Sequence, residues 1–411
     1  MPNQVNTFKI AVRQFGPFET AMQKFWDQFC HATGCDLKLE LVIMDLHDLY
    51  EATITSQGLA NGDFDISHIN TDWVYEGYLA EAFEVLNPYI NTKKPADFPN
   101  GWSKSLLSLQ RFGWEVVGLP FHDGPECFIY RKDLFESKSE QADYQKRYGK
   151  ALEVPKTWED FHQVAQFFNR PEDHLYGSVF ACYPDGHNTV FDFCLQLWTR
   201  GGSLVDKTGA IQMNSQAAIE GLDFYRAMVN DQTAVHPQSS TFESVAAGQA
   251  FSQGEAAMMI NWFGFAAMCE VNPNSKVKGS VGVDLLPSAV GKESASLNVY
   301  WLYTIGKGSK NKELAYDFLR FVTDVEQDKL LTLEGGIGCR ISTWKDQEVN
   351  KIIPYYHKLE KLHEVANMLP QHKNWTLIAK VIDEMVLKAI NSDEDSGFLI
   401  EQAQNQINKL N

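Results

Sequence analysis

The chain has 411 residues, of which 44% are hydrophobic and 22% are charged, and its formal net charge is −17. This length predicts two domains, and this composition predicts a packed core rather than wholesale disorder. Nucleic acid is excluded as a partner, because binding a polyanion depends on clustered lysine and arginine side chains and the sequence has no such cluster. No apolar run is long enough to span a bilayer.

The N-terminal part of the chain alternates between strand and helix patterns. Strands are predicted over 8–12, 37–43 and 63–69, with one helix ending near Gly34 and a second helix over 46–60. This alternation predicts an α/β fold with a mostly parallel sheet. Since ligands in such sheets lie beyond the carboxyl ends of the strands, we expect a site at the loops 14–18 and 70–73.

Signals for helix starts recur in the rest of the chain. Thr157 and Ser215 are predicted to cap two helices, and a third helix is predicted to open at Asn311. The stretch from Asn374 to Leu410 has an almost continuous amphipathic helix pattern. No internal repeat, low-complexity stretch or long linker is visible, so the connections between two lobes are expected to be short.

The seven cysteines and the polar N-terminus bear on the cellular compartment. An odd number leaves at least one thiol unpaired within a monomer, and no spacing is typical of a zinc site. Cys30 and Cys35 could form a disulfide, whereas most of the others are expected to be small buried thiols. Met1–Asn6 lack the features of a signal peptide, so the chain is either cytoplasmic or a mature sequence whose signal was replaced by a start methionine.

Three motifs for phosphate, metal and dinucleotide binding are incomplete. Residues 201–208 resemble a phosphate-binding loop, but Asp206 stands at the second glycine position and would repel phosphate. His363 opens a zinc-protease pattern whose second histidine is replaced by Asn367. Gly306 and Gly308 resemble the first two glycines of a dinucleotide-binding motif, but Asn311 stands at the third glycine position. Residues 306–308 are therefore more simply a turn from a strand to a helix. We therefore expect no catalytic residue, no metal and no cofactor.

Aromatic side chains stand beside glycines, amides and carboxylates in several predicted loops, and aromatic residues make up 12% of the chain. Sugars suit such loops, because flat rings cover apolar C–H patches while polar side chains bond the hydroxyl groups. Most rings are nevertheless expected in the core. Trp26 lies on the apolar face of a predicted helix, and Trp158 follows a helix cap.

Six stretches of the chain match known motifs in the correct order. They are Gly118–Phe121 (GLPY), Phe128–Phe135 (LYYNKDLF), Val154–Phe161 (PPKTWDEF), Gly201–Asp206 (GG-x-L-x-D), Phe251–Met258 (F-x-x-G-x-AAM) and Lys310–Leu319 (KNKE-x-A-x-x-FL). With these motifs the chain resembles the family 1 extracellular solute-binding proteins, the sugar-binding subunits of ABC importers. The resemblance covers nearly the whole chain.

The resemblance implies the type II periplasmic binding protein fold, as in maltose-binding protein. Two α/β lobes are joined by a few crossing segments, with the ligand cleft between the lobes and hinge motion closing them on the ligand. The N-terminal lobe would comprise 1–119 plus 281–325, and the C-terminal lobe 120–280 plus 326–411.

The resemblance also implies a set of ligand-binding residues, at positions where relatives contact the solute. They are Gln14, Phe15, Asp72, Trp73, His122, Asp123, Asn261, Trp262, Asn298, Tyr300, Trp301 and Arg340. The stacking tryptophan lies earlier than in the usual family pattern, and we prefer Trp262 for it, with Asn261 as a polar partner. One of Tyr300 and Trp301 should face the core, because side chains alternate along a strand.

Three of these residues have a structural alternative. Asp72 either binds the ligand or caps the following helix. Asp123 either binds the ligand, which we favour, or belongs to an Asp-Gly turn. Arg340 either binds the ligand or ties the lobe together, and we favour the structural role.

The implied function is capture of a small ligand, a sugar or oligosaccharide, in the periplasm or at the cell surface. The protein would act as a monomer and deliver the ligand to the transmembrane permease subunits of an ABC importer. Within the same fold, a polyol, a phosphodiester or a polyamine is an alternative ligand. A carbohydrate-active enzyme and a sensor or adhesin are the alternative classes, and the enzyme would require two carboxylates on either side of the bond that is cut.

Overall fold

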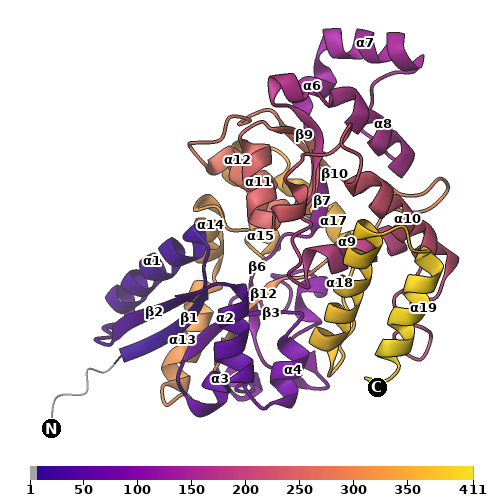
Figure 1. Ribbon diagram of the computed structural model, residues 1–411. Helices are drawn as coiled ribbons and strands as arrows, with labels where there is room; N and C mark the ends of the chain where they lie inside the picture. The colour runs from indigo at the N-terminus through magenta and orange to yellow at the C-terminus, as the bar shows by residue number, and fades with distance from the viewer. Residues whose placement is uncertain (1–6, 411) are drawn as a thin grey trace. The chain divides into compact units, whose positions relative to one another are not determined.

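The computed structural model describes residues 7–410, and these form two compact units (Figure 1). Unit 1 comprises the described residues up to Gly124, together with Val299–His357 and Gln371–Lys373. Unit 2 comprises Pro125–Asn298, Lys358–Pro370 and the described residues from Asn374 on. The lobe boundaries that the resemblance implies stay a prediction. Met1–Asn6, on which the prediction about a signal peptide rests, lie outside the described residues.

Unit 1 is built on a five-stranded sheet with the strand order β2-β1-β3-β12-β6. β1 pairs in parallel with β2 and β3, whereas β12 runs antiparallel to both of its neighbours, β3 and β6. The predicted mostly parallel sheet is therefore confirmed, with one reversed strand. The strands are β1 (Thr7–Arg13), β2 (Lys38–Met44), β3 (Ile66–Asn70), β6 (Leu119–His122) and β12 (Trp301–Ile305).

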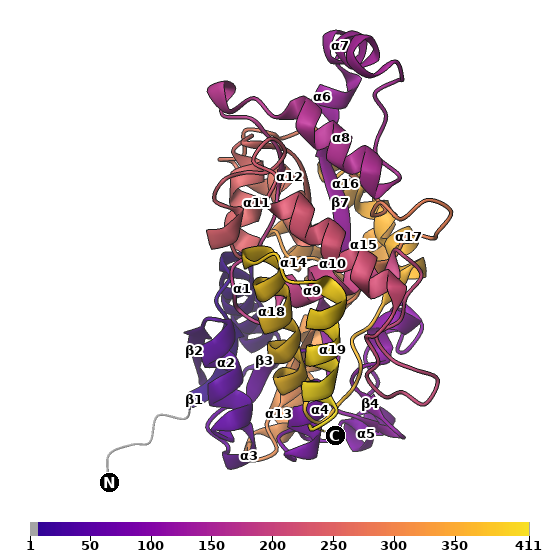
Figure 2. The same ribbon diagram turned by 45° about the vertical axis from the view of Figure 1, so that its right-hand side comes forward.

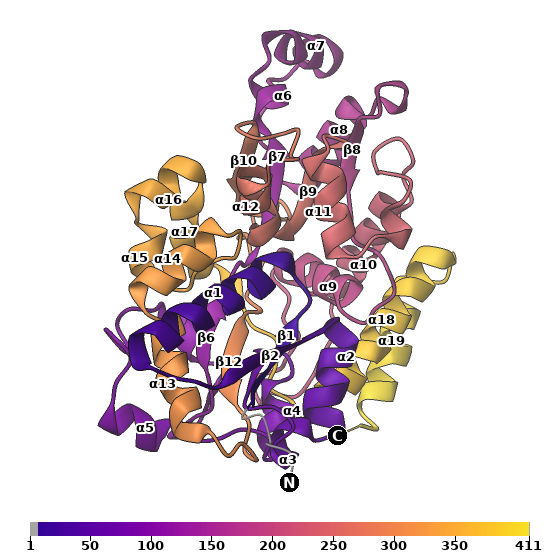
Figure 3. The ribbon, with the colours of Figure 1, turned by 90° about the vertical axis from the view of Figure 1, so that its left-hand side faces the viewer.

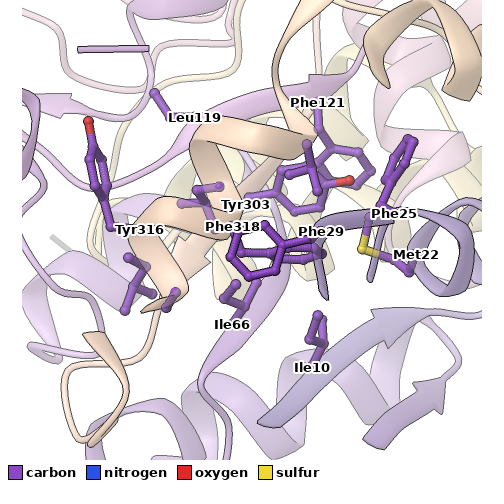
Figure 4. Packing of buried hydrophobic residues seen from close by; sticks show 14 of the residues in the cluster. Ile10, Met22, Phe25, Phe29, Ile66, Leu119, Phe121, Tyr303, Tyr316 and Phe318 are labelled. Atoms are coloured by element: carbon purple, nitrogen blue, oxygen red, sulfur yellow. The ribbon is translucent and has the colours of Figure 1, made fainter. Parts of the chain in front are cut away.

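The core of unit 1 follows from the alternation of side chains along β1. Ile10 faces an aromatic cluster formed with α1 (Gly16–Thr33) and α13 (Lys312–Val322) (Figure 4). Its neighbour Ala11 lies in a second cluster with Leu49 and Trp73. Because successive side chains point to opposite faces, each face of the sheet has its own apolar cover. Figure 3 shows α1 running alongside β1 and β2.

The predicted helix over 46–60 is wrong as a single element. The structure has α2 (Leu46–Tyr50), a π-helical turn (Glu51–Thr55) and α3 (Gly58–Asn61). Gln57 adopts a left-handed backbone with a φ of 59°, which an α-helix cannot contain. The apolar periodicity that predicted the helix does not report this break.

The remaining elements of unit 1 are short and connect or cover the sheet. They are α4 (Val74–Leu79), α5 (Asn87–Thr92), the hairpin of β4 (Arg111–Phe112) and β5 (Glu115–Val116), α14 (Val325–Leu333), α15 (Ile341–Trp344) and α16 (Gln347–Ile352). The helix predicted to open at Asn311 is confirmed as α13.

Unit 2 is built on a four-stranded sheet with the order β10-β7-β9-β8. β8 is parallel to β9, whereas β7 is antiparallel to both β9 and β10. These strands are β7 (Glu126–Arg131), β8 (Tyr176–Val179), β9 (Ala256–Trp262) and β10 (Val281–Asp284). A small parallel pair adds β11 (Ser296–Leu297) and β13 (Ala366–Asn367).

The helices of unit 2 confirm the sequence signals for caps and for the tail. The side chain of Thr157 caps α8 by accepting a hydrogen bond from the backbone N–H of Asp160, and that of Ser215 caps α10 by accepting one from the N–H of Ala218. The tail forms α18 and α19, which lie side by side (Figure 2). The helices are α6 (Lys132–Glu136), α7 (Lys138–Tyr148), α8 (Trp158–Phe168), α9 (Asn188–Trp198), α10 (Gln216–Val229), α11 (Ser244–Ser252), α12 (Phe263–Val271), α17 (Leu359–Glu364), α18 (Trp375–Asn391) and α19 (Ser396–Ile407).

Among residues 7–410, no helix combines the length and the apolar character that a membrane crossing requires.

Candidate ligand-binding site

One edge of the unit 1 sheet gathers most of the residues predicted in this unit. The parallel strands β1, β3 and β6 end at this edge, and the antiparallel strand β12 begins there. Trp301 pairs with Asn70 at the end of β3 and with His122 at the end of β6. The loops after the carboxyl ends of three strands therefore meet beside the start of a fourth, which is where open α/β sheets bind ligands.

Aromatic rings cover this edge. Trp73 and Trp301 meet edge to face with ring centroids 5.8 Å apart. Phe18 lies 4.7 Å from His122 and 4.9 Å from Phe15 between ring centroids. Trp73 is almost fully buried, whereas Phe15, His122 and Trp301 are half-buried and keep part of their surface exposed. Such partly exposed rings supply flat apolar surface for a ligand.

Polar groups accompany the rings. Gln14 is exposed directly after β1, and Asp72 is half-buried after β3. The N-cap position of α4 is occupied by Trp73, whose side chain makes no capping hydrogen bond. Asp123 is buried, and its N–H donates to the carbonyl of Ile337 over 2.9 Å. Both alternatives for Asp72 therefore stay predictions.

The hydroxyl of Tyr300 and the two terminal nitrogens of Arg340 form their hydrogen bonds inside unit 1. Tyr300 is fully buried, and its hydroxyl donates to Gln110 over 2.7 Å while accepting from the N–H of Leu109. The guanidinium of Arg340, only 1% exposed, donates to the carbonyls of Thr323 and Ala96 over 2.9 Å each. The side chains of Tyr300 and Trp301 alternate as expected, with Tyr300 inward. The structure gives no support to ligand contacts by Tyr300 or Arg340.

A buried histidine lies beneath this edge. His68 on β3 is fully buried, with its ring centroid 4.3 Å from that of Phe121 and 5.4 Å from that of Phe18. Neither ring nitrogen has a hydrogen-bond partner in the described part of the chain. Burial, and then the charge of nearby His122, lower the pKa of His68 to about 3. The ring is therefore neutral in the folded protein at physiological pH.

The corresponding edge of unit 2 carries the predicted tryptophan. β9 ends at Trp262, which pairs with Glu126 at the start of β7. The half-buried ring of Trp262 meets Phe191 of α9 edge to face at 5.6 Å. The amide of Asn261 is buried and donates to the carbonyl of Ser244 over 2.9 Å, while its oxygen accepts from the N–H of Trp262. Asn261 therefore positions the backbone at Trp262 and has little capacity left for a ligand.

Two buried carboxyl groups at this edge were not predicted. Burial, and then the charge of Asp192, raise the pKa of Glu126 well above its usual range. Burial raises the pKa of Asp192 to about 7, although the hydrogen bond from the hydroxyl of Tyr225 lowers it. Oε2 of Glu126 is buried and has no hydrogen-bond partner among residues 7–410. The pair therefore retains a proton near neutral pH and presents an oxygen that no protein group satisfies.

The sequence contains a usable signal for both acids. Glu126 directly precedes the apolar run Cys127–Ile129 of its strand, and Asp192 lies within the mostly apolar helix α9. A single acid in an apolar run is unusual, because burying an unpaired carboxyl group is costly.

Asn298, one of the predicted ligand-binding residues, is fully buried, and neither of its amide atoms has a hydrogen-bond partner in the part of the chain that the structure describes.

The incomplete motifs form turns. The carboxylate of Asp206 accepts N–H bonds from Thr208 and Ala210, so it closes a tight turn. Gly308 lies against the backbone of Gly62, where an added Cβ would stand 2.3 Å from the nitrogen of Gly62. Gly306 and Gly308 are therefore required for the close packing of the chain directly after β12. No group of three metal-ligating side chains gathers among the described residues.

A hollow of about 560 Å³ on unit 2 is lined by none of the predicted residues. Its walls come from α10 and from the end of α18, and its cation is Arg226. The guanidinium of Arg226 already donates to the carbonyl of Glu394 and to Asp223, over 2.7 and 2.6 Å. We assign no ligand to this hollow.

The two α/β units, each with aromatic rings and polar groups at a strand-end edge, define a ligand-binding protein rather than one built around a catalytic set. The chain belongs to the family described as "Bacterial extracellular solute-binding protein", whose profile matches residues 16–329. The family predicted from the motifs is therefore confirmed. Members of this family bind solutes, which favours binding over catalysis.

Relatives and solved structures agree with this assignment. A "Probable ABC transporter-binding protein" of Deinococcus radiodurans is 24% identical over 339 residues, covering 81% of this chain and 76% of that protein. Maltose-bound MalE3 of T. maritima is similar over 98% of this chain and 100% of that chain, with 22% identity and a TM-score of 0.85. An ABC transporter solute-binding protein of Agrobacterium radiobacter K84, in complex with ribitol, is similar over 100% of both chains, with 22% identity and a TM-score of 0.86. The two structures establish the two-lobed fold.

Proposed function

We propose that this chain is the extracytoplasmic solute-binding subunit of an ABC importer and that its ligand is a neutral sugar or polyol. The observation that carries the proposal is the pairing of partly exposed rings with buried or half-buried carboxyl groups at the strand-end edge of each unit. Trp301 and Asp72 provide this pairing in unit 1, and Trp262 and Glu126 provide it in unit 2. Maltose and ribitol, the ligands of two similar structures, are consistent with it.

The charge state of the buried acids favours a neutral ligand over a polyamine. A cationic ligand is best held by ionised carboxylates, whereas Glu126 and Asp192 keep a proton near neutral pH. A protonated carboxyl group both donates and accepts hydrogen bonds, which is what hydroxyl groups require. This supports a sugar or a polyol as the ligand.

The first prediction concerns ligand-induced stabilisation. At a free concentration 100 times the Kd, a ligand that binds only the folded state adds about 2.7 kcal/mol to the free energy of unfolding. We expect maltose or ribitol to raise the melting temperature by several degrees, and spermidine to leave it unchanged. Differential scanning fluorimetry measures the shift, and isothermal calorimetry then measures the Kd.

Variants of each unit test where the ligand binds. Trp262→Ala and Asp72→Asn are each expected to weaken binding about 10- to 100-fold. Trp114→Ala is the matched control, because the side chain of Trp114 is 70% exposed and lies in the hairpin turn of unit 1. If spermidine stabilises the protein and neither maltose nor ribitol does, the ligand is a polyamine and the proposed sugar or polyol is wrong. Full affinity in the Trp262 variant would show that another ring stacks on the ligand.

The proposed role in transport depends on the assignment of this chain as a solute-binding subunit. We propose that the protein acts as a monomer in the periplasm or at the cell surface, and that its lobes close on the ligand before it meets the permease subunits. Family membership supports an extracellular role. Light scattering of the purified chain would test the monomer, and fractionation of cells would test the location.

A further inference from the structure

Two of the seven cysteines differ from the others in exposure. Cys30 and Cys35 are partly exposed, whereas Cys127, Cys182, Cys194, Cys269 and Cys339 are buried. Both partly exposed cysteines pack against the edge of the unit 1 core. A soluble oxidant therefore reaches these two thiols more readily than the other five.

The end of α1 brings the two side chains together. Gly34 adopts a left-handed backbone with a φ of 74°, and its N–H donates to the carbonyl of Cys30 over 2.9 Å. In helix ends of this type, a side chain just after the left-handed residue frequently packs against the last turn of the helix, which places Cys35 beside Cys30. The nearby thiol of Cys35 adds to the effect of burial in raising the pKa of Cys30 to about 11.

We propose that Cys30 and Cys35 form an intramolecular disulfide across the end of α1 when the protein meets a small disulfide oxidant. This inference does not depend on the identity of the transported solute. It assigns to this thiol pair an oxidative modification site that lies outside the ligand-binding edges described above. The buried cysteines remain thiols.

The reaction is thiol–disulfide exchange in two steps. The thiolate of one cysteine attacks the oxidant's disulfide, so a mixed disulfide forms and one small thiolate leaves. The second cysteine then loses its proton and attacks the mixed disulfide, which forms the Cys30–Cys35 bond and releases the second small thiol. Two protein thiols are oxidised, and the oxidant is reduced to two thiols. The geometry favours the second step because the cap at Gly34 turns the chain so that both cysteines lie at the same end of α1.

Peptide mass measurement tests the proposal on the full chain. The folded protein is incubated with oxidised glutathione, alkylated and digested with trypsin, which releases Phe25–Lys38 with both cysteines and no other. We expect this peptide to be unalkylated and about 2 Da lighter than the reduced peptide, since two hydrogens are lost. The oxidised protein should also melt a few degrees higher, as expected for a short cross-link at a helix end.

Single variants make the outcome specific. Cys30→Ser and Cys35→Ser should each stop at the mixed disulfide, so the peptide gains one glutathione instead of losing two hydrogens. Cys269→Ser, at a buried cysteine, should leave the wild-type result unchanged. Two glutathione adducts on the wild-type peptide, two alkylated thiols or a disulfide-linked dimer would each overturn the proposal.

Discussion

Replacing Arg340 with alanine is expected to lower the free energy of unfolding by about 2 to 4 kcal/mol, because the loss leaves the buried carbonyl of Thr323 without a donor and also removes the hydrogen bond to the carbonyl of Ala96. The guanidinium carbon lies 4.3 Å from the ring centroid of Trp102, so the variant also loses a cation–π contact. The two carbonyls belong to Thr323 at the end of α13 and to Ala96. Arg340 thus joins three segments of unit 1 that are distant in sequence. Urea unfolding measures the change.

Two further variants separate the structural role of Arg340 from ligand binding. Arg340→Lys keeps the charge but cannot reach both carbonyls while lying flat on Trp102, so we expect an intermediate loss of stability. Arg111→Ala removes an exposed arginine of the same unit and should change stability by less than about 0.5 kcal/mol. The folded Arg340→Ala protein should bind its ligand with unchanged affinity. Normal stability with lost binding would instead show that Arg340 contacts the ligand.

The fold could be predicted where the determining interactions are local. The caps at Thr157 and Ser215 need only a neighbouring N–H, and the apolar face of α1 follows from its spacing. The break at Gln57 could not be predicted, since nothing in the periodicity around it requires a left-handed residue. The antiparallel direction of β12 could not be predicted either, because its partners β3 and β6 lie far away in sequence.

The candidate site shows the same limit. The strand-end rule placed Gln14 and Asp72 at a sheet edge from the order of nearby elements alone. Arg340 could not be separated from a ligand contact in advance, because its partner Ala96 lies 244 residues away. Glu126 and Asp192 acquire their raised pKa values from a strand and a helix that come together only in the folded unit 2. Electrostatic coupling of this kind has no pattern in the sequence.

His68 is expected to make stability depend steeply on pH on the acid side of neutrality. The ring is enclosed by Phe18, Phe121 and Tyr303 and has His122 nearby, so protonation inside the fold would bury an unpaired charge. The pKa of His68 is lowered to about 3 in the folded protein, from an ordinary value of 6.5. Between these two values the unfolded chain binds a proton that the folded chain does not.

The sign of the effect follows from this difference in bound protons. Stability falls as the pH falls from 6.5 towards 3, by up to about 1.4 kcal/mol per pH unit for one histidine. His122, whose pKa is lowered to about 4, acts in the same direction, although its ring is only half-buried. Asp192, with a pKa raised to about 7, acts in the opposite direction, because the folded state holds its proton. A comparison with a His68 variant removes these other contributions.

The measurement is the free energy of unfolding of wild type and His68→Phe at pH 6.5, 5.5 and 4.5. Phenylalanine suits the aromatic surroundings and cannot titrate, so the variant should become more stable relative to wild type by about 1 kcal/mol between pH 6.5 and 5.5 and by about 1.3 kcal/mol between pH 5.5 and 4.5. His31→Phe is the control, since His31 is exposed on α1 and its removal should leave the pH dependence unchanged. Parallel pH profiles for wild type and His68→Phe would mean that the folded protein accepts a proton on His68. The enclosure by three rings would then have to open in acid, which hydrogen exchange at β3 would detect.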